Sequence, residues 1–496
     1  MQDVKKSSYR GVVKATSILG GVQFFQIIIQ IVRSKFIAIF LGTTGMGIAS
    51  LLNSTLDLIG AFTNLGLNTS AIKNVSVANA SGDVNKVGTI VTVLRKLIWF
   101  TGILGTIITL IFSSWLSEFT FGNSEFSFAF MWISITLLFK QLTTGQLVIL
   151  QGLHKINYLA KANLVGSLIG LIVTVPLYYF FQIDAIVPAI IITSIISLIV
   201  SKYFSLKVDV TKVKVSGKKT IEESKAMVEM GVMISLNGIF TMIAAYFLKI
   251  YISNIGGVEI VGLYTAGFAI VNTYVGMIFS AMATDYYPRL SAVNTDNDLV
   301  QETVEQQALI VLLILIPIIV VFLIFSPLLI QFFYSNKFIP IVQMVNFAII
   351  GMAFRAVSWS LGFILLAKGE SKLLIKTGVG FNTVFFLCNI SGYMLMGLTG
   401  IGISFIVNYI IHLLGMLLIT KYKYSFFFSL TFYKVFLVSL LICFIGLGIT
   451  FVSNSLLRYP LGIVLIISTI YYSFIELDKR LNLREIYLNF RLKNNK

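Results

Sequence analysis

The sequence predicts an all-α membrane protein with about 14 transmembrane helices, in which two parallel six-helix lobes surround a central cavity and two additional helices follow them. Three observations predict this fold class: the composition, the succession of long apolar segments and an internal repeat. Hydrophobic residues make up 57% of the 496 residues and charged residues only 11%, whereas a soluble domain carries about 25% charged residues. The chain therefore cannot cover itself with a water-solvated surface.

Long apolar segments recur along the whole chain, and a bilayer-spanning helix needs about 20 such residues. We expect helices because the hydrocarbon core offers no water to unpaired backbone groups, and because the segments are too long for barrel strands. The predicted spans are residues 15–39, 46–66, 88–112, 127–149, 158–181, 185–204, 230–252, 260–284, 304–325, 340–367, 373–395, 399–420, 432–453 and 459–475.

The charge of the chain is strongly basic, with 37 Lys and Arg against 20 Asp and Glu. If the N-terminus is cytoplasmic, most basic residues lie in inner segments such as 202–225 and 479–496, while the outer loops carry only Lys337 and Arg458. This is the positive-inside pattern, and it predicts that both termini are cytoplasmic. We therefore expect contact with anionic membrane lipids and no nucleic-acid partner. The basic start lacks a small-residue cleavage site, so the first apolar stretch is interpreted as a retained span.

An internal repeat appears when the chain is laid on itself with a shift of 215 residues. The matches pair Gly42 and Gly47 with Gly257 and Gly262, Lys140 with Arg355, and Lys161 with Lys376. Each copy holds six spans, an even number, so both copies have the same orientation in the membrane. Such parallel repeats are typical of transporters that bind their substrate between two halves.

The repeat also predicts the domain organisation. We expect an N-terminal six-helix lobe at 1–215, a C-terminal six-helix lobe at 216–430, two additional transmembrane helices at 431–476 and a basic cytoplasmic tail at 477–496. One chain would then contain a complete transport pathway, which predicts a functional monomer.

Ionisable residues inside the predicted spans are few, and each costs at least about 2.5–3.5 kcal/mol on insertion scales, so each needs a reason. Asp57, Lys140 and Arg355 are placed near the midplane, and Arg33, Lys35 and Lys249 closer to the outer surface. The first span adds a polar stripe of Gln23, Gln26, Gln30 and Arg33. At helical spacing these side chains share an arc of roughly 80°, so that side of the helix is expected to face protein or water.

These residues predict a water-filled cavity with a net positive charge, because Asp57 is the only acid near the midplane while Lys140 and Arg355 project from equivalent places in the two halves. Such a cavity favours an anion, for example a pyrophosphate. Other interpretations stay open. Asp57 and Lys140 could form a structural ion pair, the glutamines could bond to neighbouring helices, and Arg33, Lys35 and Lys249 could be interfacial anchors.

Signals for an enzyme are missing from the sequence. There is no Gly-rich phosphate loop followed by Lys and Ser or Thr, no carboxylate pair and no Cys/His cluster. Cys388 and Cys443 lie in apolar runs and are interpreted as small core residues, and His412 as a packing residue. We therefore expect no enzyme activity, no cofactor and no metal, with transport driven by an ion gradient, the membrane potential or the substrate's own gradient.

Short motifs at helix ends add a resemblance that covers essentially the whole chain. They are Leu41-Gly42 with Gly45-Met46-Gly47, Tyr287-Pro288-Arg289-Leu290-Ser291, Ser335-Asn336-Lys337-Phe338 and Ala367-Lys368-Gly369. By their order and spacing the chain resembles the Wzx-type flippases, the O-antigen translocases of the polysaccharide transporter branch of the MOP (MATE-like) superfamily. The resemblance implies two lobes around a V-shaped cavity and transport by alternating access in the bacterial cytoplasmic (inner) membrane.

The implied substrate is an undecaprenyl-diphosphate-linked oligosaccharide, an O-antigen, capsule or related repeat unit, moved from the inner to the outer leaflet. Arg33, Lys140 and Arg355, with Gln23, Gln26 and Gln30, occupy positions suited to binding it, and Asp57 is the candidate ion-coupling acid. A polysaccharide polymerase is the expected partner. The alternatives are a MATE-like ion-coupled multidrug exporter and a lipid II-type flippase. The second is an alternative because the two additional helices resemble the two extra helices of lipid II flippases. A membrane enzyme is the least favoured, because the outer loops are short.

Overall fold

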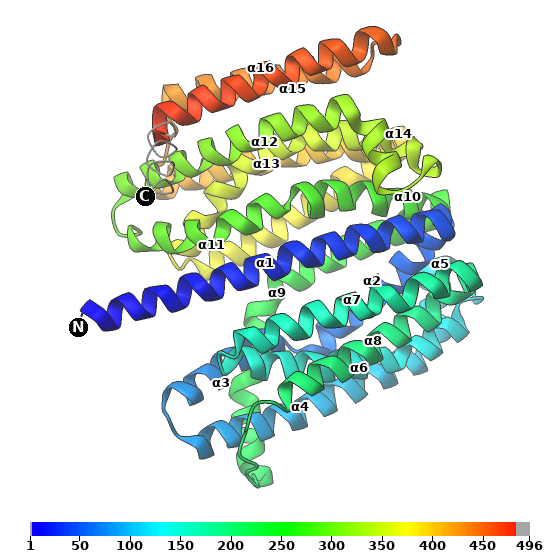
Figure 1. Cartoon of the computed structure of the whole chain (residues 1–496), viewed down its shortest axis with the longest axis vertical. Coiled ribbons are helices and arrows are strands. Elements are labelled where there is room, and N and C mark those ends of the chain that lie inside the picture. The colour runs from blue at the N-terminus through cyan, green and yellow to red at the C-terminus, as the bar shows by residue number, and fades with distance from the viewer. Residues whose placement is uncertain (1, 483–496) are drawn as a thin grey trace, which may run out of the picture. The chain divides into compact units, whose positions relative to one another are not determined.

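The computed structural model describes the backbone of residues 2–482 and the side chains of residues 20–480 and of Asn482. Within residues 2–482 the chain is almost entirely helical and contains no β-strand. It forms two compact units: one runs up to Thr265 and includes Phe333–Lys337, and the other holds Ala266–Phe332 and the residues from Phe338 onward. In each unit the long helices run roughly side by side (Figure 1).

In the part of the chain that the structure describes, the first unit is built from nine α-helices, one 3₁₀ turn and the start of a tenth α-helix. They are α1 (Gln2–Phe40), α2 (Gly42–Asn64), α3 (Leu67–Ala80), α4 (Val84–Ile111), α5 (Ser113–Phe121), α6 (Ser127–Gly152), α7 (Ile156–Phe181), the 3₁₀ turn η1 (Gln182–Ala185), α8 (Ile186–Ser205), α9 (Gly217–Gly256) and the start of α10 (Val258–Phe268). The ends of α3, α4, α6 and α9 share a small apolar core that includes Leu94, Ile149 and Met227.

The second unit continues from α10 into a π-helical segment, η2 (Ala269–Val275). It contains α11 (Met277–Ala292), α12 (Asn297–Phe333), η3 (Asn336–Ile341), α13 (Val342–Ala367), α14 (Ser371–Tyr424), α15 (Leu430–Thr450) and α16 (Ser455–Leu481). The last two helices lie against each other at one side of this unit (Figure 1). They are the two additional helices predicted from the sequence.

The predicted number of crossings is confirmed. Among the described residues, twelve helical segments are long and apolar enough to span a membrane. Two of these, Ile156–Ser205 with 50 residues and Ser371–Tyr424 with 54, are long enough for two crossings each, since one crossing takes about 20 residues. Both contain a break, at η1 in the first and at Met396 and Gly397, whose backbone angles are not helical, in the second. Counting each as a pair gives fourteen crossings.

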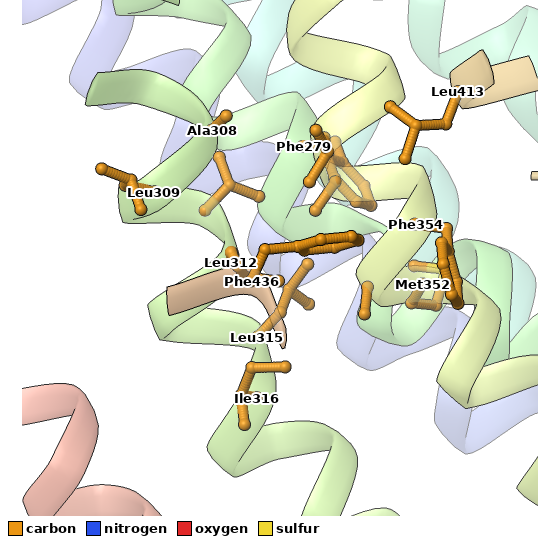
Figure 2. Packing of buried hydrophobic residues seen from close by; sticks show 14 of the residues in the cluster. Phe279, Ala308, Leu309, Leu312, Leu315, Ile316, Met352, Phe354, Leu413 and Phe436 are labelled. Carbon is orange, nitrogen blue, oxygen red and sulfur yellow. The ribbon is translucent and has the colours of Figure 1, made fainter. Parts of the chain in front are cut away.

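The centre of the second unit is a large apolar cluster around α12. Leu312, Leu315 and Ile316 are fully buried on that helix, and they pack in one cluster with Phe279 of α11 and with side chains of α13 and α15, labelled in Figure 2. Close packing of this kind holds the helices in fixed positions. One of them is α13, which carries Arg355.

In the first unit, α2 and α10 approach so closely that only glycine fits at the contact. A Cβ atom at Gly47 would lie 2.0 Å from the carbonyl oxygen of Val258, and one at Gly262 would lie 1.9 Å from that of Thr43. Small residues allow such close contact between membrane helices. Gly47 and Gly262 are one of the pairs matched by the internal repeat.

The predicted lobe boundary at 215/216 falls in the non-helical connection between α8 and α9. The two compact units are a different division of the chain, so the lobes at 1–215 and 216–430 stay a prediction. Most of the predicted basic tail, residues 483–496, lies outside the described residues.

Candidate functional site

A cavity of about 560 Å³ lies in the first unit, between α1, α2, α7, α9 and α10. Its volume is within the range of roughly 300–1,000 Å³ that is usual for small-molecule sites. Every one of these helices contributes polar side chains to the wall. They are Gln26, Gln30, Arg33 and Ser34 of α1, Ser50, Asn53, Ser54 and Asp57 of α2, Ser167 of α7, Lys249 of α9 and Thr265 of α10.

The polar stripe of α1 forms one side of this cavity, as the spacing predicted. Gln26, Gln30 and Arg33 are in the wall, whereas Gln23 is exposed and lies outside it. The two glutamines have both donor and acceptor atoms. They can therefore bind hydroxyl groups as well as charged oxygens.

Arg33 is half-buried in the wall, and its Nε atom is buried without a hydrogen-bond partner among the described residues. Its guanidinium lies beside Gly170 of α7, where a Cβ atom would come within 3.1 Å of Nη2. Because Gly170 has no side chain, the guanidinium of Arg33 has room between α1 and α7 and can reach the cavity. A cation in that position, with no carboxylate bound to it, is a ready partner for an anion.

Lys249 is a second cation in the wall. Its Nζ donates a hydrogen bond of 2.7 Å to the Oγ of Ser54, a neutral group that orients the ammonium without cancelling its charge. The sequence marked Lys249 as an ionisable residue within a span but favoured no role for it in a cavity. The packing of α9 against α2, which brings Lys249 to Ser54, connects residues 195 positions apart and has no local signal.

Asp57 and Lys140 form an ion pair, with 2.9 Å between Oδ1 and Nζ. The structure thus contains the ion pair that was one of the interpretations left open by the sequence. Asp57 lines the cavity, whereas Lys140 of α6 is not in the wall. Both side chains keep substantial exposure, 52% for Asp57 and 39% for Lys140. In this arrangement the carboxylate of Asp57 neutralises Lys140.

The charges around the cavity do not balance. Arg33 and Lys249 are in the wall, Lys140 reaches it through Asp57, and Asp57 is the only carboxylate among the described residues of the wall. Three cations against one carboxylate leave an excess of two positive charges. The sequence predicted a cationic cavity into which Lys140 and Arg355 project; the present cavity has an excess of positive charge, but neither of these two residues is in its wall.

Arg355 belongs to the second unit. Its Nη1 donates a 2.6 Å hydrogen bond to the Oδ1 of Asn272, and its guanidinium carbon lies 5.1 Å from the ring centre of Phe279 and 5.5 Å from that of Tyr409. These contacts hold the guanidinium by an amide and two aromatic faces. That Arg355 and Lys140 bind the same substrate stays a prediction.

The chain was compared with known proteins. The model of a family described as "Polysaccharide biosynthesis protein" matches residues 25–343. A "Putative O-antigen transporter" of Shigella flexneri is 24% identical over 353 residues, which are 70% of this chain and 82% of that protein.

Solved structures share the fold. A multidrug resistance MATE family transporter of the MOP superfamily, in its inward-facing conformation, aligns with a TM-score of 0.69 at 15% identity, covering 82% of this chain and 96% of that one. The lipid II flippase MurJ, in an inward closed conformation, aligns with a TM-score of 0.61 at 13% identity, covering 95% of this chain and 99% of that one. At these identities the likeness concerns the fold, and it confirms the predicted MATE-like architecture.

Proposed function

The chain belongs to the polysaccharide biosynthesis protein family, and we propose that it is a flippase for a polyprenyl-diphosphate-linked oligosaccharide, such as an O-antigen or capsule repeat unit. It would carry this substrate from the inner to the outer leaflet by alternating access. The observation that carries the proposal is the polar cavity with two cations, Arg33 and Lys249, neither of which forms an ion pair with a carboxylate among the described residues. The protein is a multi-pass membrane protein, and ionisable residues inside membrane spans commonly mark the path of a substrate or an ion.

A diphosphate fits the chemistry of this wall. Its oxygens are strong acceptors, and guanidinium and ammonium groups are the side chains that bind phosphate best. Arg33 supplies directed donors and Lys249 a compact charge, while Gln26, Gln30 and the hydroxyl groups of α2 suit the first sugars. At about 560 Å³ the cavity would hold the diphosphate and a small part of the glycan. The remaining sugars and the lipid chain would extend beyond it.

The relatives support a lipid-linked glycan substrate. The Shigella flexneri relative is named an O-antigen transporter, and one of the solved structures with this fold is a lipid II flippase. We extend the proposal to an undecaprenyl carrier, to a location in the cytoplasmic membrane with both termini inside, and to a functional monomer that supplies a polysaccharide polymerase. Asp57 is proposed as the ion-coupling acid, and Gln23, Lys140 and Arg355 as further binding residues.

A cation-coupled drug exporter is the second candidate, because a MATE family transporter shares the fold. Cationic drugs need carboxylates in the binding cavity. Among the wall residues that the structure describes, Asp57 is the only carboxylate, and it already pairs with Lys140. The charge of the cavity therefore favours the anionic substrate.

The test is transport in liposomes. Purified protein would be reconstituted with a short polyprenyl-diphosphate oligosaccharide, and its movement between leaflets compared for the wild type, Arg33→Gln and Lys249→Gln, with exposed Lys86→Gln as the control. We expect transport by the wild type and by the control, and a loss of about 10-fold or more in each cavity variant, because a charge-assisted contact contributes roughly 1.5–3 kcal/mol. A wild type that moves no such lipid under any imposed ion gradient would overturn the proposal.

A further inference from the structure

Two polar pairs occupy equivalent places in the internal repeat. Asp57 pairs with Lys140 at 2.9 Å in the first unit, and Asn272 pairs with Arg355 at 2.6 Å in the second. In both, the partners are 83 residues apart, and each member of the second pair follows its counterpart by the 215-residue shift of the repeat. The same contact has thus been kept in both copies, with different residues.

The two pairs differ in charge. The carboxylate of Asp57 neutralises Lys140, whereas the amide oxygen of Asn272 orients Arg355 and leaves its charge in place. Among the described residues, none of the ion pairs involves Arg355. The rings of Phe279 and Tyr409 lie close to the guanidinium, and they attract a cation without cancelling it. Arg355 is therefore a partly exposed cation that is held in position and remains charged.

The backbone around Asn272 is also specialised. Asn272 sits in the middle of η2, a π-helical segment, whereas Asp57 sits in a regular α-helix. Gly276 directly follows η2, and a residue with a side chain would not fit there. A Cβ atom at this position would lie 2.0 Å from the carbonyl oxygen of Asn272. Short π-helical segments inside α-helices occur frequently at functional sites. Here the segment presents the amide of Asn272 to Arg355.

From these observations we propose that Asn272 sets the charge selectivity of the transporter: its neutral amide positions Arg355 to bind the diphosphate, while the equivalent Lys140 is held by Asp57. This inference rests on the proposed function and assigns unequal roles to two cations that the repeat alone makes equivalent. Asn272 acts through Arg355 and is thus a positioning residue.

The decisive variant is Asn272→Asp, which has nearly the same shape and converts the second pair into an ion pair like the first. Binding would be measured in nanodiscs of zwitterionic lipid with three probes that share one chain: farnesyl diphosphate, farnesyl monophosphate and farnesol. We expect the affinity for the diphosphate to fall by about 10-fold or more, because the new carboxylate neutralises Arg355 and repels the diphosphate. The monophosphate should lose less and farnesol nothing.

The control is Asn85→Asp, which adds the same charge at an exposed position in the first turn of α4 and should leave all three affinities unchanged. An equal loss for all three probes in Asn272→Asp would indicate a purely structural role, and an unchanged diphosphate affinity would show that Asn272 does not control Arg355. Either result overturns the inference while the proposed function stands. A wild type that binds neither charged probe would overturn both.

If Asn272→Asp fails to fold, a second comparison tests the same idea. Arg355→Gln and Lys140→Gln each remove one of the two equivalent cations. Arg355→Gln should weaken diphosphate binding by a factor several times larger than Lys140→Gln does, because Lys140 has a carboxylate partner and Arg355 has none among the described residues. Equal losses in the two variants would contradict the unequal roles.

Discussion

The hydroxyl oxygens of Ser50 and Thr265 lie 2.8 Å apart, and the two residues are separated by 215 positions in the chain. That separation is the shift of the internal repeat, so each residue meets its own counterpart. Gly47 and Gly262, equivalent by the same shift, are also close, since a Cβ atom at Gly262 would lie 3.0 Å from the backbone nitrogen of Gly47. Contacts between equivalent residues are what a two-fold relation produces, and here they occur between α2 and α10.

This contact predicts that the glycines of α2 and α10 are essential for stability. Gly262→Ala should lower the melting temperature of the detergent-purified protein by several degrees, because overpacking costs about 1–3 kcal/mol and the new methyl group would meet backbone. Gly238→Ala in α9 is the control, since nothing lies within 4 Å of a Cβ atom there. If Gly262→Ala is as stable as this control, α2 and α10 can move apart at the contact without loss of stability.

A second prediction concerns the ion pair. Asp57→Asn keeps the size of the side chain but removes the one carboxylate that the described part of the chain contributes to the cavity wall. If Asp57 couples transport to an ion, the variant should keep transport down the substrate gradient and lose its stimulation by an imposed proton or sodium gradient. Flux in liposomes with and without each gradient measures this. Stimulation that persists in Asp57→Asn would place the coupling group elsewhere.

A third prediction separates the glutamines of the first helix. Gln26→Leu and Gln30→Leu should each raise the substrate concentration needed for half-maximal transport about 5-fold or more, because each loses hydrogen bonds worth roughly 0.5–1.5 kcal/mol in the cavity. Gln23→Leu is the matched comparison, and it should have a smaller effect since Gln23 is exposed outside the wall. Equal effects at all three positions would mean that the stripe contacts substrate along its whole length.

A fourth prediction concerns pH and lies outside the spans. A hydrogen bond from Lys423 holds the pKa of Glu370, at the start of α14, below its usual value. A lowered carboxyl pKa contributes stability that is present above the unfolded-state pKa and lost as the pH falls through the folded-state pKa. The difference in melting temperature between pH 7 and pH 4 should therefore be smaller in Glu370→Gln than in the wild type. A difference of the same size in both proteins would show that this contact does not contribute.

The sequence predicted the helices well because the membrane acts on each segment separately. A stretch of about 20 apolar residues can satisfy its backbone only as a helix, whatever its neighbours are, so all fourteen crossings could be read one at a time. The polar face of α1 was predictable for the same reason. The spacing of Gln26, Gln30 and Arg33 places them on one side of a helix, and that side lines the cavity.

The sequence by itself thus determined the spans, the polar face of the first helix and the repeat. Only the tertiary structure decided which of the charged side chains are neutralised by a partner of opposite charge. Lys249 joined the cavity through contact with Ser54, 195 residues away, while Lys140 was bound by Asp57 and Arg355 by a neutral amide. The reason is physical: a residue's charge is encoded locally, but its neutralisation depends on which side chains lie within about 4 Å, and packing between distant segments sets those distances.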